Sequence, residues 1–378
     1  MPRRSLFALM LVPWLALFGT LPASARGSEP ETAYPHKGFT SEEFGQGARS
    51  YWLFEPDGPK PAKAPVVVFH HGWLAVNPGL YGAWIEHLTR SGLVVIFPRY
   101  QADWATRPVE FLPNAVEAVR AAFDVLDGAP GRVRPDRERF ALIGHSAGGN
   151  LSAQMAAVAA EEGLPRPKAV VSIFPGEVVA QHEPSFGRIP AETLLVVAAA
   201  EQDVVVGDAR ARQIYAEATA IPLSRKKYVL YRSDRHTAPA LVADHFAPSA
   251  MLTSLDTGEG PFRQVQVGRA GVDILDRYGF WRLADLTLSA AFANLTLDEV
   301  TDHGAKFRDL GRWGDGQPVT PPIAGDDLST IPRVIPTYGA RLIPWSPNAI
   351  LRYLENRPRV GGLGSPTSGV VSRASDPS

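Results

Sequence analysis

The sequence predicts an α/β protein built on a doubly wound, mostly parallel sheet with helices on both faces. From residue 64 onward, short runs of β-branched and apolar residues alternate with longer segments of helical periodicity. This alternation is typical of parallel strands joined by crossover helices. The chain has 378 residues, 45% of them hydrophobic, so it is long enough to bury a large core.

The strands of this sheet are expected in runs of four to seven residues that are apolar or nearly so. They are predicted at Val66–Phe69, Leu93–Phe97, Phe140–Ile143, Val170–Phe174, Leu194–Ala200 and Tyr228–Tyr231. Helices are expected between them, because apolar residues there recur at helical spacing. They are predicted at Gly79–Arg90, Leu112–Leu126, Ala147 to about Glu162, Asp208 to about Thr219, and Val272–Phe292, which Gly279 could interrupt.

The first 25 residues have the pattern of a secretory signal peptide. Arg3 and Arg4 precede an apolar run from Leu6 to Leu21, and the small residues Ala23-Ser24-Ala25 follow, as at a cleavage site. The alternative is a membrane anchor, but Pro13 interrupts the run, which is shorter than the roughly 20 residues of a spanning helix. We therefore expect a secreted or periplasmic protein that begins near residue 26 and keeps no stable membrane anchor.

Charge and cysteine content narrow the classes of partner and site. The formal net charge is −1 and the chain has no cysteine. A nearly neutral chain gives no reason to expect nucleic acid as a partner. The lack of cysteine excludes disulfides, thiol nucleophiles and thiolate metal sites, so the core alone must hold the fold.

The rest of the chain divides by composition. Residues 26–295 are expected to form the catalytic domain, and residues 296–356 an irregular extension packed on it. The final segment, residues 357–378, is rich in Gly, Ser and Pro and is predicted to be disordered.

The segment Gly144-His145-Ser146-Ala147-Gly148 has the G-x-S-x-G pattern of a nucleophile elbow. In such an elbow a strand turns abruptly into a helix and presents the serine hydroxyl, and both flanking glycines are needed where backbones approach. The motif follows a predicted strand and opens a predicted helix, which is the context it requires. The alternative is a tight strand-to-helix turn whose serine is idle.

A serine nucleophile needs a histidine base and a carboxylate that orients it, in the chain order Ser, acid, His. Asp203 directly follows the strand from Leu194, and His236 lies just beyond the strand that ends at Tyr231. These two residues are therefore the predicted acid and base, with Ser146 as nucleophile.

Other residues could serve as the acid or the base. Asp208 falls at the start of a predicted helix, where an acid is favourable to the helix dipole, and Asp234 is too close to His236 in the chain to reach it from a neighbouring strand end. His245 is the competing base, but it lies nine residues beyond His236 in a segment expected to be helical. Its alternative role is that of a packed or capping histidine.

The oxyanion hole is expected from two backbone amides, those of Ala147 and Trp73. Gly72 lets the loop after the first strand turn so that the Trp73 amide faces the site. The adjacent His70 and His71 could suggest a metal, but neighbours on a strand point to opposite faces. No H-E-x-x-H motif or carboxylate cluster accompanies them, so neither a metal nor a cofactor is expected.

Together, His71-Gly72-Trp73, the elbow, Asp203 and His236 resemble the α/β-hydrolase superfamily, and in particular its dienelactone hydrolase, cutinase-like polyesterase and chlorophyllase-like branches. The resemblance covers roughly residues 50–295 and implies an acyl-serine mechanism on esters. The histidine lacks the glycine that often precedes it, and the last 80 or so residues have no counterpart. His71, Trp104 and Phe186 are candidate substrate contacts, and scattered loop aromatics can equally be ordinary packing.

The sequence thus predicts an exported serine hydrolase that cleaves carboxylic esters, with a small-molecule or lipid-like ester as substrate. An acyltransferase or amidase could use the same three residues. A non-catalytic binding protein on the same scaffold is a further alternative, because function resides in the site and not in the fold.

Overall fold

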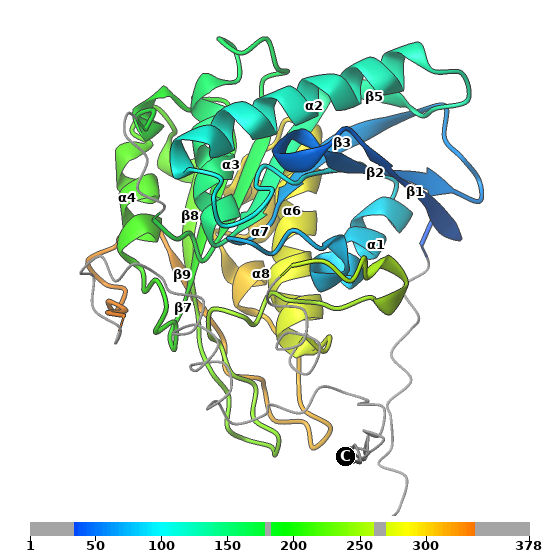
Figure 1. Ribbon diagram of the computed structural model, residues 1–378. Coiled ribbons are helices and arrows are strands. Elements are labelled where there is room, and N and C mark those ends of the chain that lie inside the picture. Colours follow the sequence, from blue (N-terminus) through cyan, green and yellow to red (C-terminus); the bar gives the residue numbers. More distant parts are fainter. Residues whose placement is uncertain (1–33, 178–182, 261–269, 337–378) are drawn as a thin grey trace, which may run out of the picture. The chain divides into compact units, whose positions relative to one another are not determined.

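The computed structural model describes residues 34–177, 183–260 and 270–336, which form a nine-stranded sheet with helices on both faces (Figure 1). The strand order is β1-β2-β4-β3-β5-β6-β7-β8-β9. Neighbours from β4 to β8 in this order run parallel, whereas the pairs β1–β2, β2–β4 and β8–β9 are antiparallel. The predicted doubly wound α/β fold is confirmed. The strands are β1 (Gly38–Phe44), β2 (Tyr51–Asp57), β3 (Lys63–His70), β4 (Val94–Pro98), β5 (Arg134–His145), β6 (Ala169–Ile173), β7 (Leu194–Ala200), β8 (Lys226–Tyr231) and β9 (Ile323–Gly325).

Helices form one layer on each side of the sheet (Figure 1). Residues of α2, α3 and α4 share one apolar cluster with the sheet, and residues of α1 and α6 share the other. The α-helices are α1 (Gly82–Arg90), α2 (Phe111–Gly128), α3 (Ala147–Val158), α4 (Ala209–Glu217), α6 (Arg282–Phe292), α7 (Leu297–Thr301) and α8 (Ala305–Arg308). Single turns of 3₁₀-helix occur at Gly47–Arg49, Pro78–Tyr81, Pro108–Glu110, Phe186–Arg188, Leu223–Arg225 and Thr253–Leu255.

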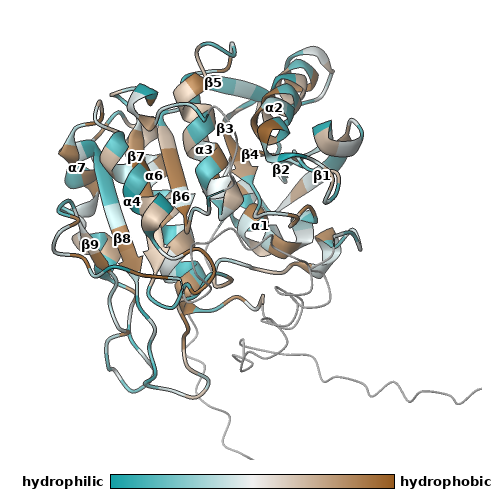
Figure 2. Cartoon of the chain, turned by 60° about the vertical axis from the view of Figure 1, so that its left-hand side comes forward, coloured by the Kyte–Doolittle hydropathy of each residue, from teal (hydrophilic) through white to brown (hydrophobic). Residues whose placement is uncertain are grey.

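The central strands are apolar on both faces because both faces are covered. In β3, Val66 and Val68 belong to the cluster under α2 and α3, whereas Val67 and Phe69 belong to the cluster under α1. All four side chains are fully buried, and successive residues point to opposite faces, as in any strand. Figure 2 shows the central strands as hydrophobic bands between helices of mixed character. This double burial explains the continuous apolar runs in the sequence.

The helix predicted over Val272–Phe292 is not interrupted by Gly279. A π-helix, Leu275–Trp281, runs directly into α6, and Gly279 lies within it. A Cβ at Gly279 would lie 3.0 Å from the ring of Tyr231 on β8. The glycine therefore allows the π-helix to pack closely on the sheet.

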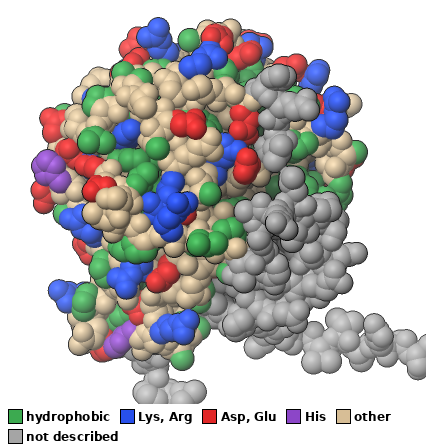
Figure 3. Space-filling model, turned by 90° about the vertical axis from the view of Figure 1, so that its left-hand side faces the viewer, with side chains coloured by type: hydrophobic (Ala, Val, Ile, Leu, Met, Phe, Trp, Pro, Cys, Tyr) green, Lys and Arg blue, Asp and Glu red, His purple; other side chains and the backbone are tan. Residues whose placement is uncertain are grey.

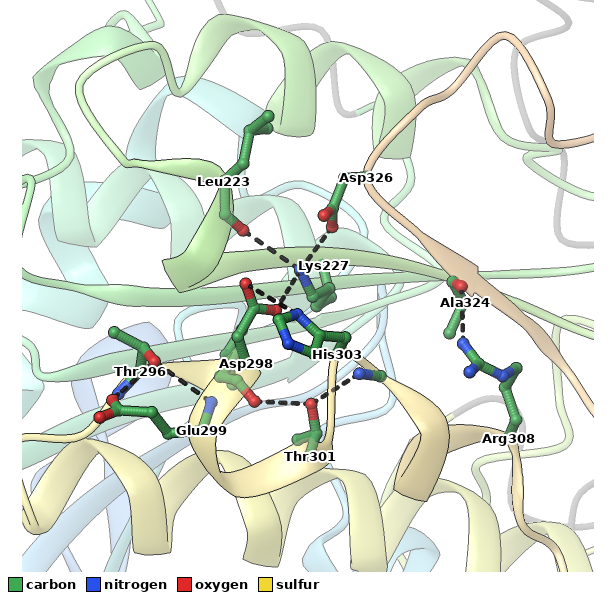
Figure 4. Close-up of polar contacts among 12 residues, drawn as sticks. Leu223, Lys227, Thr296, Asp298, Glu299, Thr301, His303, Arg308, Ala324 and Asp326 are labelled. Carbon is green, nitrogen blue, oxygen red and sulfur yellow. Dashed lines mark hydrogen bonds and ion pairs between the residues drawn. The ribbon is translucent and has the colours of Figure 1, made fainter.

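The chain after residue 295 joins the sheet through β9, which pairs with β8. Figure 4 shows the polar contacts of this region around Lys227 of β8. The Lys227 side chain is 1% exposed, and its ammonium lies 2.7 Å from the carboxylate of Asp298 and 2.6 Å from that of Asp326. The described part of the predicted extension is thus attached to the core by a strand and by two ion pairs to one buried lysine.

The predicted signal peptide, residues 1–25, and the predicted tail, residues 357–378, lie outside the described residues. In the part of the chain that the structure describes, no helix has the length and apolar character to cross a membrane. On the face shown in Figure 3, acidic and basic side chains are interspersed, consistent with the formal net charge of −1.

Candidate active site

Ser146 stands at the turn between β5 and α3, where the sequence predicts a nucleophile elbow. Its backbone has φ 56° and ψ −124°, a strained conformation that residues with a side chain rarely adopt. The Ser146 amide donates to the carbonyl of Ile173 at 2.9 Å, and its carbonyl accepts from Gly149 and Gly176 at 2.9 and 3.0 Å. These bonds hold the hydroxyl at the carboxyl end of the parallel strands.

The glycines around Ser146 are required by contacts between backbones. A Cβ on Gly144 would lie 2.1 Å from the carbonyl oxygen of Gly148, and a Cβ on Gly148 would lie 2.2 Å from that of His70. Cβ atoms essentially never come within 3.0 Å of another heavy atom. The tight turn of the elbow leaves no room for a side chain at Gly144, and its packing on β3 leaves none at Gly148.

Three side chains meet at this turn: Ser146, His245 and Asp203. The Ser146 hydroxyl oxygen lies 2.8 Å from Nε2 of His245, and Nδ1 of His245 lies 2.8 Å from Oδ2 of Asp203. All three residues are less than 9% exposed. Because an ionised carboxylate only accepts hydrogen bonds, the network assigns the imidazole proton to Nδ1 and leaves Nε2 free to accept from the serine.

Asp203 is held by the turn that follows β7. Its Oδ1 atom accepts the backbone N–H groups of Val205 and Val206, each at 2.9 Å, while Oδ2 accepts from His245. Both carboxylate oxygens are therefore satisfied inside the protein, and the carboxylate is aimed at the histidine. The rival Asp208 instead precedes α4 and pairs with Arg212 at 2.5 Å.

His236, the predicted base, does not reach Ser146. Its Nε2 atom lies 2.6 Å from a carboxylate oxygen of Asp315, and both side chains are exposed at the surface. His245, the rival in the sequence, occupies the position expected for His236. The prediction of His236 as the partner of Ser146 is therefore corrected to His245.

The physical reason is an excursion of the chain between β8 and His245. Asp234 and Leu241 exchange two backbone hydrogen bonds of 2.9 Å, which close a loop that carries His236 away from the sheet. The chain then returns, because the amide of Gln202 donates to the carbonyl of Ala243 at 2.9 Å. This bond brings the segment that contains His245 beside the turn of Asp203.

The loop after β3 carries Trp73, whose amide is one of the two expected to form an oxyanion hole. The Ala75 amide donates to the Gly72 carbonyl at 2.9 Å, which closes a turn with Trp73 and Leu74 at its centre. Leu74 has φ 57°, and its amide donates to the side-chain oxygen of Gln101 at 2.8 Å. Among the described residues, we find no hydrogen-bond acceptor for the Trp73 amide.

This loop lies against Ser146. A Cβ on Gly72 would lie 3.4 Å from the Cβ of Ser146 and 3.2 Å from the Tyr81 hydroxyl oxygen, so the loop lies directly beside Ser146. Ala147, the first residue of α3, also has an amide for which the described part of the chain offers no acceptor. The two amides expected to form an oxyanion hole are therefore both available beside Ser146.

Two of the candidate substrate contacts are buried and are corrected. His71 is fully buried, and its two ring nitrogens lie 2.6 and 2.7 Å from the backbone carbonyls of Gly72 and Arg99. Burial lowers the pKa of His71 to about 4, so the ring is neutral and donates to only one of them. Phe186 is 2% exposed within the apolar core.

The third candidate, Trp104, is 39% exposed. Its ring meets that of Trp73 edge to face, with 5.1 Å between the ring centroids. Because Trp73 belongs to the loop beside Ser146, this aromatic pair stays a candidate contact for substrate.

His70 is buried and contacts Ser152. Its Nδ1 atom lies 2.9 Å from the hydroxyl of Ser152, and burial lowers the pKa of His70 to about 3. In the described ranges, no group of three or more His, Cys, Asp or Glu side chains is arranged to hold a metal ion.

Two polar residues beside the site were not singled out in the sequence as site residues. His145, within the motif itself, lies with its Nε2 atom 2.7 Å from the carbonyl oxygen of His245. Tyr81 reaches the same ring from the opposite side. The elbow motif leaves the position before the serine open, so nothing in its pattern indicates a role for His145.

Comparison with known proteins agrees with this fold. A family model described as "alpha/beta hydrolase fold" matches residues 66–243, a range that contains Ser146, Asp203 and the loop after β3. The sheet topology and this match together show that the chain has the α/β-hydrolase fold. The comparison reaches the superfamily and not a particular branch of it.

The chain is also similar to esterase LipI of Mycobacterium tuberculosis (strain ATCC 25618 / H37Rv). The two are 32% identical over 122 residues, which are 32% of this chain and 36% of the relative. The match thus spans only about a third of that relative's length.

Proposed function

We propose that this protein is an exported serine hydrolase that cleaves carboxylic esters through an acyl-serine intermediate. One observation carries the proposal: His245 lies between Ser146 and Asp203, with its Nε2 2.8 Å from the serine hydroxyl oxygen and its Nδ1 2.8 Å from a carboxylate oxygen of Asp203. This is the arrangement of a nucleophile, a general base and a carboxylate that orients the base. The similarity to an esterase favours an ester over other acyl compounds.

In the first half of the reaction, the Ser146 oxygen attacks the carbonyl carbon of the ester while His245 accepts the hydroxyl proton. The carbonyl oxygen becomes an oxyanion that the amides of Trp73 and Ala147 stabilise by hydrogen bonds. The C–O bond to the alcohol then breaks, and the imidazolium of His245 gives its proton to the leaving oxygen. Asp203 stays ionised and stabilises that imidazolium.

In the second half, water replaces the alcohol. His245 removes a proton from the water, whose oxygen attacks the acyl carbon on Ser146. The second tetrahedral intermediate collapses, the acyl C–O bond to Ser146 breaks, and His245 returns the proton to the serine oxygen. The products are a carboxylic acid and the regenerated enzyme.

The experiment is turnover of an ester series from acetate to palmitate, with matched anilides, by the wild-type protein and by Ser146→Ala. Ester turnover that Ser146→Ala abolishes is the expected result. Faster cleavage of the anilides, or transfer of the acyl group to an added alcohol, would favour the amidase or acyltransferase alternative. A folded protein without turnover of any of these compounds would favour the non-catalytic binding alternative.

Export is the part of the proposal that rests on residues 1–25. Their charged, apolar and small-residue segments support cleavage after Ala25. N-terminal sequencing of protein recovered from outside the cytoplasm should begin at Arg26, and retention of residues 1–25 in that protein would contradict cleavage.

A further inference from the structure

We propose that Tyr81 and His145 are positioning residues that connect the oxyanion loop, the nucleophile elbow and the base through one chain of hydrogen bonds. The inference rests on the proposed function, because it assigns Gly72–Trp73, Ser146 and His245 to the catalytic machinery.

The hydrogen-bond chain has three links, all inside the protein. The Gly72 amide donates to the Tyr81 hydroxyl oxygen at 3.0 Å. That oxygen lies 2.9 Å from Nδ1 of His145, and Nε2 of His145 lies 2.7 Å from the carbonyl oxygen of His245. Tyr81 and His145 are 2% and 3% exposed.

The direction of every proton in this chain follows from its two ends. The Gly72 amide can only donate, so the Tyr81 oxygen accepts there and gives its own proton to Nδ1 of His145. The His245 carbonyl can only accept, so Nε2 of His145 carries the ring proton. A neutral imidazole has one donor and one acceptor, and this chain uses both. One tautomer of His145 therefore satisfies the whole network.

The charge state of His145 fits this role. Burial, and secondly the neighbouring His245, hold the pKa of His145 well below its ordinary value. The centroids of the two rings lie only 5.0 Å apart. A neutral His145 can thus hold the backbone of His245 without placing a positive charge beside the imidazolium that forms during the reaction.

The contacts fall on the three segments that must keep their relative positions during the reaction. Gly72 precedes Trp73, which supplies one oxyanion donor, and His145 precedes Ser146. His145 binds the backbone of His245, while Asp203 binds its ring. A displacement of about 1 Å between such groups can lower a rate by roughly 10²-fold.

The first test is Tyr81→Phe, which removes only the hydroxyl and keeps the ring that packs on Phe69. We expect kcat to fall about 10–100-fold with KM changed less than about twofold, because the network aligns reacting groups and does not bind substrate. The matched control is Tyr231→Phe. Tyr231 is also fully buried, and its hydroxyl has no partner among the described residues, so its kcat should match that of the wild type.

The second test compares His145→Gln with His145→Leu. The Gln amide carries an acceptor oxygen and a donor NH₂ group, so it can replace both hydrogen bonds of the neutral ring, whereas Leu carries neither. We expect Gln to recover most of the kcat that Leu loses, with both variants folded by circular dichroism. This comparison stays informative even if Tyr81→Phe does not fold.

Two results would overturn the inference. One is a wild-type kcat in Tyr81→Phe accompanied only by a lower Tm, and the other is an equal loss of kcat in His145→Gln and His145→Leu. Ser146→Ala, measured in parallel, shows whether the positioning role alone is wrong or the proposed hydrolase function is wrong as well. If Ser146→Ala abolishes turnover while Tyr81→Phe is fully active, the hydrolase proposal stands and the positioning role does not.

Discussion

Nε2 of His245 lies 2.8 Å from the hydroxyl oxygen of Ser146, although 99 positions separate the two residues in the chain. A contact of this length between an imidazole and a serine hydroxyl is within the range that general-base catalysis requires. Because Asp203 binds the other nitrogen of the same ring, the contact selects His245 over His236 as the base in the proposed mechanism.

The first prediction tests whether His245 or His236 acts as the base. His245→Ala should lower kcat by about 10⁴–10⁶-fold, as loss of the base does in serine hydrolases. His236→Ala removes an exposed pair with Asp315 and a ring contact with Trp313, both away from Ser146, so its kcat and KM should match the wild type. The measurement is steady-state kinetics of both variants on one ester, with circular dichroism to verify folding. An inactive but folded His236→Ala would return the role of base to His236.

The second prediction concerns the acid. Asp203→Asn should keep the fold but lower kcat by roughly 10⁴-fold, because an amide can hold the imidazole with the wrong nitrogen protonated. Asp208→Asn is the control, since Asp208 pairs with Arg212 and not with a histidine. It should cost about 1–3 kcal/mol of unfolding free energy with near-normal turnover. If Asp208→Asn were the inactive variant, the assignment of the acid would be wrong.

The third prediction tests the close packing of the elbow. Gly148→Ala would put a Cβ 2.2 Å from the His70 carbonyl oxygen, so the elbow must shift or the protein must fail to fold. Gly128→Ala, at the end of α2, meets nothing within 4 Å and should be neutral or slightly stabilising. Soluble yield, Tm and kcat of the two variants check this. Wild-type values for Gly148→Ala would contradict the described contact.

The fourth prediction is a loss of stability in mild acid. Burial lowers the pKa of His70 to about 3, that of His71 to about 4 and that of His145 well below its ordinary value. In the unfolded chain these groups titrate near about 6.5, so below that pH the unfolded state binds protons that the folded state does not. The stability that these neutral buried histidines contribute is fully present above about pH 6.5. It is lost as the pH falls toward the folded-state pKa values.

Each of these histidines then lowers the free energy of unfolding by about 1.4 kcal/mol per pH unit. Denaturant unfolding between about pH 7 and pH 5 measures this slope. His145→Gln should reduce the slope by the contribution of one histidine. An unfolding free energy that does not change over this range would show that these rings are not buried in the neutral form.

Local patterns predicted the central sheet and the elbow correctly. Within each strand from β3 to β8, the predicted segment is buried on both faces, so its sequence is a largely apolar run that can be recognised without knowing its neighbours. The glycines around Ser146 are likewise explained within a strand-turn-helix segment. By contrast, β1, β2 and β9 pair antiparallel at the edges of the sheet, and their sequences lack that uniform apolar pattern.

The base could not be chosen by distance along the chain. His236 is closer to the end of β8, but the pairing of Asp234 with Leu241 carries it away, and only a bond between distant segments brings His245 back. The burial of His71 and Phe186 also results from packing between elements remote in sequence. These features depend on tertiary contacts that no single segment encodes.

The most direct test of the account is covalent labelling with a fluorophosphonate, which reacts with an activated serine. Intact-mass measurement and peptide mapping should find one adduct per chain, on Ser146, with a labelling rate that falls steeply in His245→Ala and stays unchanged in His236→Ala. An adduct on another residue, or full labelling of Ser146 in a folded His245→Ala variant, would contradict the claim that His245 activates Ser146.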